Sequence, residues 1–167
     1  RTLLDTTSAL STTLRLDKLL ERVLDELQRV VPYDAASINL LRGEHCWPAA
    51  SRGFGRAPLQ RFALQEFPCV QRVVREAAPV IISDTGGEAS FSPAEEPGST
   101  RSWLGVPLIS KNEVVGVLMV DSQSPGAYDE QIARLASAFA HQVAMAIDNA
   151  RLYEQTRAQL RESTLLR

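Results

Sequence analysis

The stretch that decides the fold is SWLGVPLISKNEVVGVLMVDS, residues 102–122, in which two apolar runs flank a short polar turn. The turn holds Lys111 and Asn112, and asparagine tolerates the left-handed backbone that tight turns need. Side chains of a strand alternate between its two faces, so Trp103 and Gly105 share one face of the first run while leucine and valine fill the other. The stretch therefore predicts a β-hairpin whose two faces differ in character.

Further strands are expected upstream of this hairpin. Residues 35–42 and 45–52 flank a Gly-Glu pair, and a glycine in the first of two turn positions favours a type II′ hairpin. A short β-branched run at 80–84 predicts another strand. Residues 53–68 contain glycine, proline and isolated aromatic residues without a clear period, so we expect a loop there with a short turn of helix.

Apolar residues recur at spacings of three and four in three segments, which predicts amphipathic helices at 17–31, 69–78 and 129–167. Asp17 is the expected N-cap of the first helix. Residues 2–14 carry only a narrow apolar stripe and predict a weaker helical lead-in. The order of elements predicts an α+β fold. Its central antiparallel sheet has five or six strands, with the N- and C-terminal helices on one face and a pocket covered by loops and a short helix on the other.

The chain is expected to form one domain with helical extensions, because 167 residues support one core but not two comfortable domains. We assign residues 1–16 to a linker helix, 17–153 to the domain and 154–167 to a helical extension too polar for a compact core. Residues 84–101 are rich in Gly, Ser, Pro and Glu, and so long a loop predicts a lid over the pocket. The chain begins without an initiator methionine, so we expect a piece of a longer protein.

The composition argues against several functional classes. It is 44% hydrophobic and 23% charged, and no apolar run approaches the ~20 residues that span a bilayer. A net charge of −2, with basic residues scattered among acidic ones, argues against binding nucleic acid or an anionic membrane. Cys46 and Cys69 show no CxxC spacing, which argues against a disulfide framework and a thiolate metal site and favours a cytoplasmic setting.

Three runs of the chain carry a family pattern: RSWLGVPLI, EVVGVLMVDS and YDEQIARLASAFAHQVAMAIDNARLYEQ. They resemble the GAF domain, a small-molecule-binding and dimerising module of signalling proteins. The positions of the family's motifs are occupied by Gly116, Val117, Leu118, Asp121, Ala146, Ile147, Asn149, Ala150, Leu152 and Tyr153. The helix LDKLLERVLDELQRVVPYDAASINLL is similar to the family's opening, so the resemblance covers nearly the whole chain.

The resemblance implies a sensory domain of a bacterial signal-transduction protein that is not itself an enzyme. Such a domain is expected to bind a small molecule and to relay the change through dimeric flanking helices to an attached output domain. The expected output is a histidine kinase, with a nucleotide cyclase as the other choice. An alternative is a pocketless module that supports dimerisation and relays motion, and a cavity of ~300 Å³ or more would favour sensing over it.

Specialised members of the family need particular residues. Bilin-binding members attach their pigment through a cysteine followed by histidine, whereas Cys46 precedes tryptophan and Cys69 precedes valine. The dispersed pattern associated with cyclic nucleotides lacks its Asn-Lys pair. His45 adjoins a turn and His141 lies off the apolar stripe of the last helix, so both are expected to be solvated rather than to bind haem iron. Neither a covalent bilin nor a haem is expected, and the ligand stays unknown.

Free methionine sulfoxide reductases, which resemble this fold, remain an alternative because they work through clustered cysteines. Cys46 occupies a strand position that alternation can bury, and Cys69 lies at an expected helix N-terminus, where the dipole favours a thiolate. We interpret both as small core residues, because the catalytic cysteine cluster of those enzymes is not visible.

Polar and aromatic side chains on the loop side of the sheet form the candidate pocket. Alternation places polar residues of the first strand opposite its aliphatic ones, and a tryptophan beside a glycine offers a flat wall with free space. An arginine at the end of the expected lid suits an anionic group. The candidate ligand-binding residues are Ser37, Asn39, Phe54, Phe67, Phe91, Arg101, Trp103, Gly105, Met119 and Asp121.

The two terminal helices are expected to pair across a homodimer and form a parallel bundle, because the polar extension cannot be ordered by a core of its own. The positions expected to contact the second chain follow the apolar spacing of each helix. The candidate interface residues are Leu3, Leu10, Leu14, Phe139, Val143, Ala146, Tyr153 and Leu160.

Overall fold

The computed structural model describes the backbone of residues 2–55, 59–87 and 100–166, and the side chains of 13–55, 59–87 and 100–164. Its centre is a six-stranded antiparallel sheet in the order β3-β2-β1-β6-β5-β4. The strands are β1 (Ala35–Arg42), β2 (His45–Arg52), β3 (Phe62–Ala63), β4 (Val80–Ile82), β5 (Ser102–Ser110) and β6 (Glu113–Ser122). The helices are α1 (Thr2–Leu27), α2 (Pro68–Glu76) and α3 (Glu130–Leu166), with 3₁₀ turns at Leu64–Glu66 and Thr85–Gly87.

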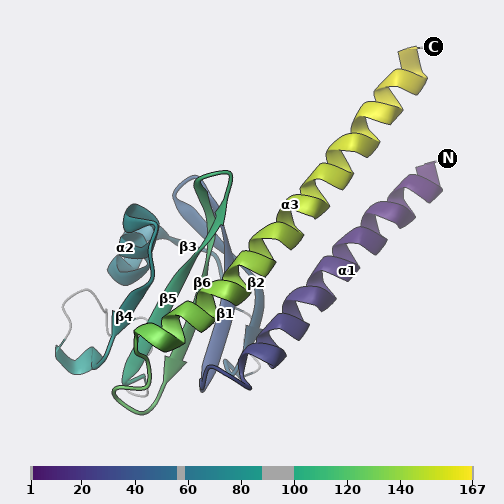
Figure 1. Ribbon diagram of the computed structural model, residues 1–167. Coiled ribbons are helices and arrows are strands. Elements are labelled where there is room, and N and C mark those ends of the chain that lie inside the picture. Colours follow the sequence, from purple (N-terminus) through teal and green to yellow (C-terminus); the bar gives the residue numbers. More distant parts are fainter. Residues whose placement is uncertain (1, 56–58, 88–99, 167) are drawn as a thin grey trace.

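The two long helices and the short helix cover opposite faces of the sheet. α1 and α3 lie side by side on one face and project together beyond it, so that both ends of the chain lie at the same end of the molecule (Figure 1). α2 packs on the other face, against β5 and β6. This arrangement confirms the predicted α+β fold with N- and C-terminal helices on one face.

Alternation along the strands divides the interior into two apolar clusters. Leu104 and Leu118 point toward α1 and α3, where they join Leu24 and the rest of the larger cluster. Trp103 points the other way and joins the smaller cluster beneath α2. Full burial of one leucine stabilises the folded state by about 1.5–3 kcal/mol, so the larger cluster provides most of the stability.

The hairpin of β5 and β6 forms as its residues predict. Lys111 and Asn112 both have positive φ, 52° and 66°, which is the conformation of a type I′ turn that matches the twist of paired strands. The first hairpin turns at Gly43, whose φ is 61°. At the far end of the second hairpin, the hydroxyl of Ser110 donates a hydrogen bond to the carboxylate of Asp148 on α3.

The expected start of a helix at Asp17 is wrong. α1 is continuous from Thr2 to Leu27, because residues 12–17 contain neither Gly nor Pro and nothing interrupts the backbone ladder. Asp17 is an exposed residue within the helix rather than its N-cap. The helix also ends four residues before the expected end at Val31, in a turn where the hydroxyl of Tyr33 donates to the carbonyl of Leu24 at 2.8 Å.

The segment expected as a loop at 53–68 contains a short strand. β3 pairs its two residues with His45 and Cys46 at the edge of the sheet. The following 3₁₀ turn leads into α2, which begins at Pro68 and ends before Ala77, where φ is 51°. Two paired residues are too few for a period in the sequence, which is why the prediction missed this strand.

α3 begins where the sequence predicts and runs far beyond the sheet. Its first turn is capped by Asp129, whose carboxylate accepts a hydrogen bond from the amide of Ile132 at 2.8 Å. From Arg151 to Thr164 every residue except Arg157 is exposed. No helix in the described parts of the chain has the length and hydropathy needed to cross a membrane.

Candidate functional site

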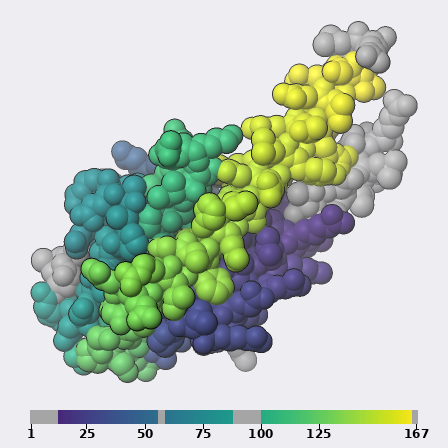
Figure 2. Space-filling view, in the orientation of Figure 1, coloured from purple at the N-terminus to yellow at the C-terminus, as the bar shows by residue number. Residues whose placement is uncertain are grey.

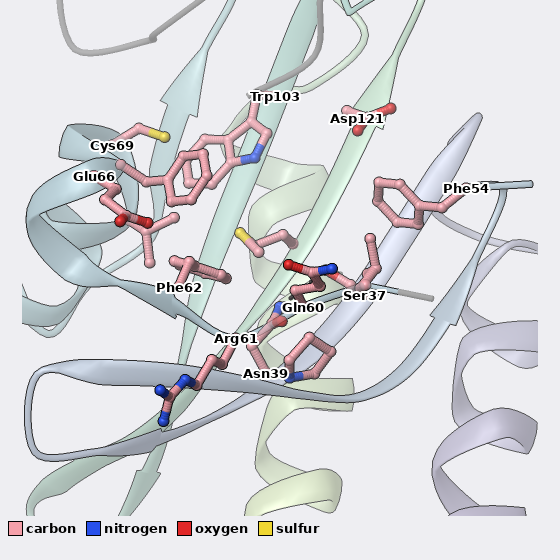
Figure 3. A pocket seen from close by; sticks show the side chains of 15 residues that line it. Ser37, Asn39, Phe54, Gln60, Arg61, Phe62, Glu66, Cys69, Trp103 and Asp121 are labelled. Carbon is pink, nitrogen blue, oxygen red and sulfur yellow. Dashed lines mark hydrogen bonds between the residues drawn. The ribbon is translucent and has the colours of Figure 1, made fainter. Parts of the chain in front are cut away.

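A cavity of about 340 Å³ lies between the sheet and the segment that carries β3 and α2 (Figure 3). The sheet provides its floor, and the residues after β2 provide its outer wall. The described residues that line it are Ser37, Asn39, Pro48, Phe54, Leu59, Gln60, Arg61, Phe62, Glu66, Phe67, Cys69, Val70, Trp103, Met119 and Asp121. A space of this size holds a small organic molecule.

Aromatic rings form much of the wall. Phe62 and Phe67 meet edge to face, with ring centroids 4.6 Å apart, and they belong to the cluster that also holds Trp103. The indole of Trp103 is only 5% exposed and lies over Gly105, where an added Cβ would come within 2.2 Å of the ring carbon Cη2. The tryptophan ring therefore occupies the space that a side chain at position 105 would need. The free space expected beside Trp103 is absent at that point.

The floor of the cavity is polar and fully buried. Ser37 and Asn39 of β1 are each 1% exposed, and the Asn39 amide donates a hydrogen bond to the Ser37 hydroxyl at 2.9 Å. The neighbouring strand approaches closely, because a Cβ added to Gly116 would lie 2.3 Å from the Asn39 carbonyl oxygen. The close approach of β6 thus fixes the backbone of β1, while the side chains of Ser37 and Asn39 face the cavity.

A family model described as the GAF domain matches residues 13–148, which is most of the chain. The chain belongs to the GAF-domain family. This match confirms the resemblance drawn from the residues of the last hairpin and the last helix. A GAF domain is a regulatory module of signalling proteins.

Among curated proteins, the GAF domain is similar to the anaerobic nitric oxide reductase transcription regulator NorR of Shigella boydii. The two are 27% identical over 148 residues, which cover 83% of this chain and 29% of the regulator. The same regulator from Escherichia coli strain K12 is also 27% identical over 148 residues, with the same coverage. The chain therefore spans less than a third of the length of the curated relatives it matches.

Solved structures show the same fold at low identity. The type II free methionine-R-sulfoxide reductase of Thermoplasma acidophilum superposes with a TM-score of 0.73 and 18% identity, covering 83% of this chain and 96% of the reductase. A domain of a putative two-component sensor histidine kinase protein from Sinorhizobium meliloti gives 0.64 and 19%, with coverages of 84% and 95%. These likenesses establish the GAF fold.

Most of the candidate pocket residues of this GAF domain come together in the structure. The cavity is lined by Ser37, Asn39, Phe54, Phe67, Trp103, Met119 and Asp121, so that residues distant in the sequence share one wall. Phe91 and residues 88–99 of the expected lid lie outside the described residues. Ligand binding by this set stays a prediction.

Arg101 and Gly105 do not line the cavity in the part of the chain that the structure describes. The Arg101 guanidinium is exposed and lies 3.4 Å from the carboxylate of Asp84. Hydrogen bonding from the Gly86 amide, and then from Arg101, holds the pKa of Asp84 below its usual value. Arg101 is thus engaged at the base of the loop rather than presented to a ligand.

Residues after the first hairpin supply the part of the wall that the sequence did not predict. Leu59, Gln60, Arg61, Phe62 and Glu66 belong to the segment expected as a loop. Phe54 and Phe67 of the same segment were predicted to line the pocket, but without a recognised β3 nothing indicated that the residues between them also lie against it.

The two cysteines of the GAF domain are buried in the cluster beneath α2. Burial raises the pKa of the Cys46 thiol to about 11, so this thiol is protonated at neutral pH. Cys69, the second residue of α2, lines the cavity and is 1% exposed. No group of three or more His, Cys, Asp or Glu suited to a metal occurs among the described residues.

The structure places the residues of the expected dimer stripe in different surroundings, and a contact with a second chain stays a prediction. Val143 is fully buried in the larger cluster of its own chain and Phe139 packs against that cluster, so Val143 is not available to a second chain. Ala146 and Tyr153 face α1 across a groove of about 350 Å³. Figure 2 shows α3 beside the described part of α1 on this face.

Leu14 and Leu160 are exposed, at 58% and 63%, on the two helices that project beyond the sheet. Both therefore remain candidates for a contact with a second chain. The side chains of Leu3 and Leu10 lie outside the described residues.

Proposed function

We propose that this GAF domain is a sensory domain that binds a small molecule in the cavity between the sheet and α2. The observation that carries the proposal is the cavity itself, about 340 Å³ in volume, with apolar walls and a buried polar floor. A binding site of this kind obtains affinity from apolar contact and orientation from a few polar groups. The volume favours this reading over a pocketless dimerisation module.

The strands under the cavity also contact the long helices, which supports a relay. β5 places Trp103 in the cavity wall and packs its other face on α3, while its end is joined to α3 through Ser110 and Asp148. At the other side, the Arg52 guanidinium of β2 lies 3.0 Å from the Asp25 carboxylate of α1. A ligand that favours one packing of sheet on helices would thereby bias both helices.

We further propose that the domain acts as a homodimer through the projecting parts of α1 and α3, attached to an output domain. An exposed polar helix with scattered leucines is not stable alone, and a second copy is the partner that would order both projecting helices at once. A relative that is a transcription regulator and a structural neighbour from a histidine kinase protein both support a signalling output. A histidine kinase remains our expected output, and two buried cysteines without a disulfide framework favour the cytoplasm.

The test is native mass spectrometry of the domain purified without refolding, after an absorption spectrum has been taken. We expect a small molecule to remain bound, and to be lost from Ser37→Phe, which places a ring in the floor of the cavity. A matched control is Leu19→Phe on α1, which leaves the cavity untouched. Retention of the same molecule in Ser37→Phe would contradict binding in this cavity.

A thiol-dependent reductase is the second candidate, because Cys69 lines the cavity and reductases share the fold. The raised pKa of Cys46 argues against it, since a protonated thiol is a poor nucleophile. An assay on free methionine sulfoxide decides between the two. Turnover that is lost in both Cys46→Ser and Cys69→Ser would establish the reductase.

A further inference from the structure

The charges and ring faces of the cavity carry information on the ligand that the proposed function leaves open. We propose that the cavity takes an organic cation, a small molecule with an ammonium group on an apolar body. This inference rests on the proposed function, because it names the ligand class of the same site.

The acidic side chains stand on two sides of the cavity. Asp121 is half-buried on β6, paired in register with Trp103, and Glu66 belongs to the 3₁₀ turn before α2. In Figure 3 the two carboxylates lie on either side of the Trp103 indole. Aspartate and glutamate ordinarily carry a negative charge at neutral pH, so a ligand between them meets negative charge from both directions.

Arg61 is the one basic side chain among the described residues that line the cavity. Its guanidinium lies 5.2 Å from the centroid of the Trp47 ring, and Trp47 is not part of the lining. In Figure 3 this guanidinium is directed away from Asp121 and Glu66. The formal charge of the described lining residues is therefore negative, and the one positive group among them makes a cation–π contact at the margin of the cavity.

The aromatic residues add to the preference for a cation. Phe54, Phe62, Phe67 and Trp103 all line one space, and an aromatic ring attracts a cation to its face through its quadrupole. Ring faces with nearby carboxylates are a combination suited to ammonium groups, because the rings contact the apolar body while a carboxylate accepts from N–H. An anionic ligand would meet repulsion from the carboxylates of Asp121 and Glu66.

Isothermal titration calorimetry on the 167-residue chain tests the class with three probes that share a phenylethyl body: 2-phenylethylammonium, 3-phenylpropionate and 2-phenylethanol. We expect the ammonium to bind at least about tenfold more tightly than the other two, because it alone combines a positive charge with N–H donors and so forms an ion pair with a carboxylate. Asp121→Asn and Glu66→Gln, on different walls, should each weaken its binding several-fold or more. Glu113→Gln, at the far end of the strand that carries Asp121, is the matched control and should leave binding unchanged.

Binding of the carboxylate or the alcohol as tight as that of the ammonium would overturn the cation class. An absence of binding by all three probes would overturn it as well. Equal affinity of the ammonium for the wild type, Asp121→Asn and Glu66→Gln would also overturn it. A molecule without a basic nitrogen found in the cavity by native mass spectrometry would overturn the class too, yet it would support the proposed function. The two claims therefore fail separately.

Discussion

Gly105 determines where the wall of the cavity lies. Because it has no side chain, the Trp103 indole lies flat against its backbone and remains 5% exposed. The prediction that Trp103 belongs to the pocket came from alternation along the strand, which sets the side of the sheet. The orientation of the ring did not follow from alternation, because it depends on contacts with other strands and with α2.

Replacing this glycine tests the arrangement. In Gly105→Ala the new Cβ would lie 2.2 Å from Cη2 of Trp103, so the indole must move or the strands must separate. We expect the free energy of unfolding to fall by about 1–3 kcal/mol, as for other overpacked cores, and the near-ultraviolet circular dichroism to change. The control is Gly87→Ala, where a Cβ meets nothing within 4 Å, and which should cost less than about 0.5 kcal/mol. Equal stability of the two variants would contradict the packing of Trp103 on Gly105.

The Cys46 thiol gives the fold a dependence on alkaline pH. Burial raises its pKa from the ordinary value of 9.0 to about 11, so the folded state favours the protonated thiol. The resulting stabilisation is fully present below pH 9 and is lost as the pH rises from 9 toward 11. We expect the free energy of unfolding to fall across this window by roughly 2 kcal/mol more in the wild type than in Cys46→Ala. Urea denaturation at several pH values measures this difference, and parallel curves for the two proteins would show that the thiol titrates normally.

At the scale of elements, regular alternation and long helical periods could be read from the sequence. The β5–β6 hairpin and α3 follow their predictions because many residues repeat one signal. β3 could not be predicted, since two paired residues carry no period and their pairing depends on how the chain returns to β2. The start of α1 was misplaced at Asp17 because a residue that favours N-caps also tolerates an exposed place within a helix.

α1 contributes to stability mainly through the face it turns to the sheet. Leu24 is fully buried in the larger cluster, while Leu19, on the same helix, is 40% exposed. We expect Leu24→Ala to lower the free energy of unfolding by about 2–5 kcal/mol, and Leu19→Ala by less than about 1 kcal/mol. Chemical denaturation of both variants measures the contrast. A larger loss of unfolding free energy in Leu19→Ala than in Leu24→Ala would contradict the observed orientation of α1 on the sheet.

At the scale of the whole molecule, the two projecting helices determine how the domain meets a partner. Val143 of the predicted stripe cannot contact a second chain, because it packs into the core between the sheet and α3. What remains exposed toward the end of α3 includes Leu152, at 49%, and Leu160, at 63%. The apolar spacing of α3 is therefore real, but near Val143 it reflects contact within one chain.

We expect Leu160→Glu to weaken the homodimer, because each copy would place a charge in the shared apolar seam. The dissociation constant should rise about tenfold or more, which corresponds to about 1.4 kcal/mol. Leu135→Glu, at the sheet end of the same helix, is the control and should dimerise like the wild type. Sedimentation velocity over a concentration series measures both. A wild-type domain that stays monomeric at high concentration would contradict the dimer.

The central claim, that the cavity beneath α2 is where a small molecule binds, has a direct test in nuclear magnetic resonance. The chain has two methionines and two tryptophans, and one of each kind, Met119 and Trp103, lines the cavity. The other two, Met145 and Trp47, lie outside it and are about half exposed. With methionine methyl and indole N–H labels, addition of fractionated small-molecule extract from the source cells is expected to shift the Met119 and Trp103 signals more than those of Met145 and Trp47. Shifts confined to Met145 or Trp47, or no shift with any fraction, would contradict the claim.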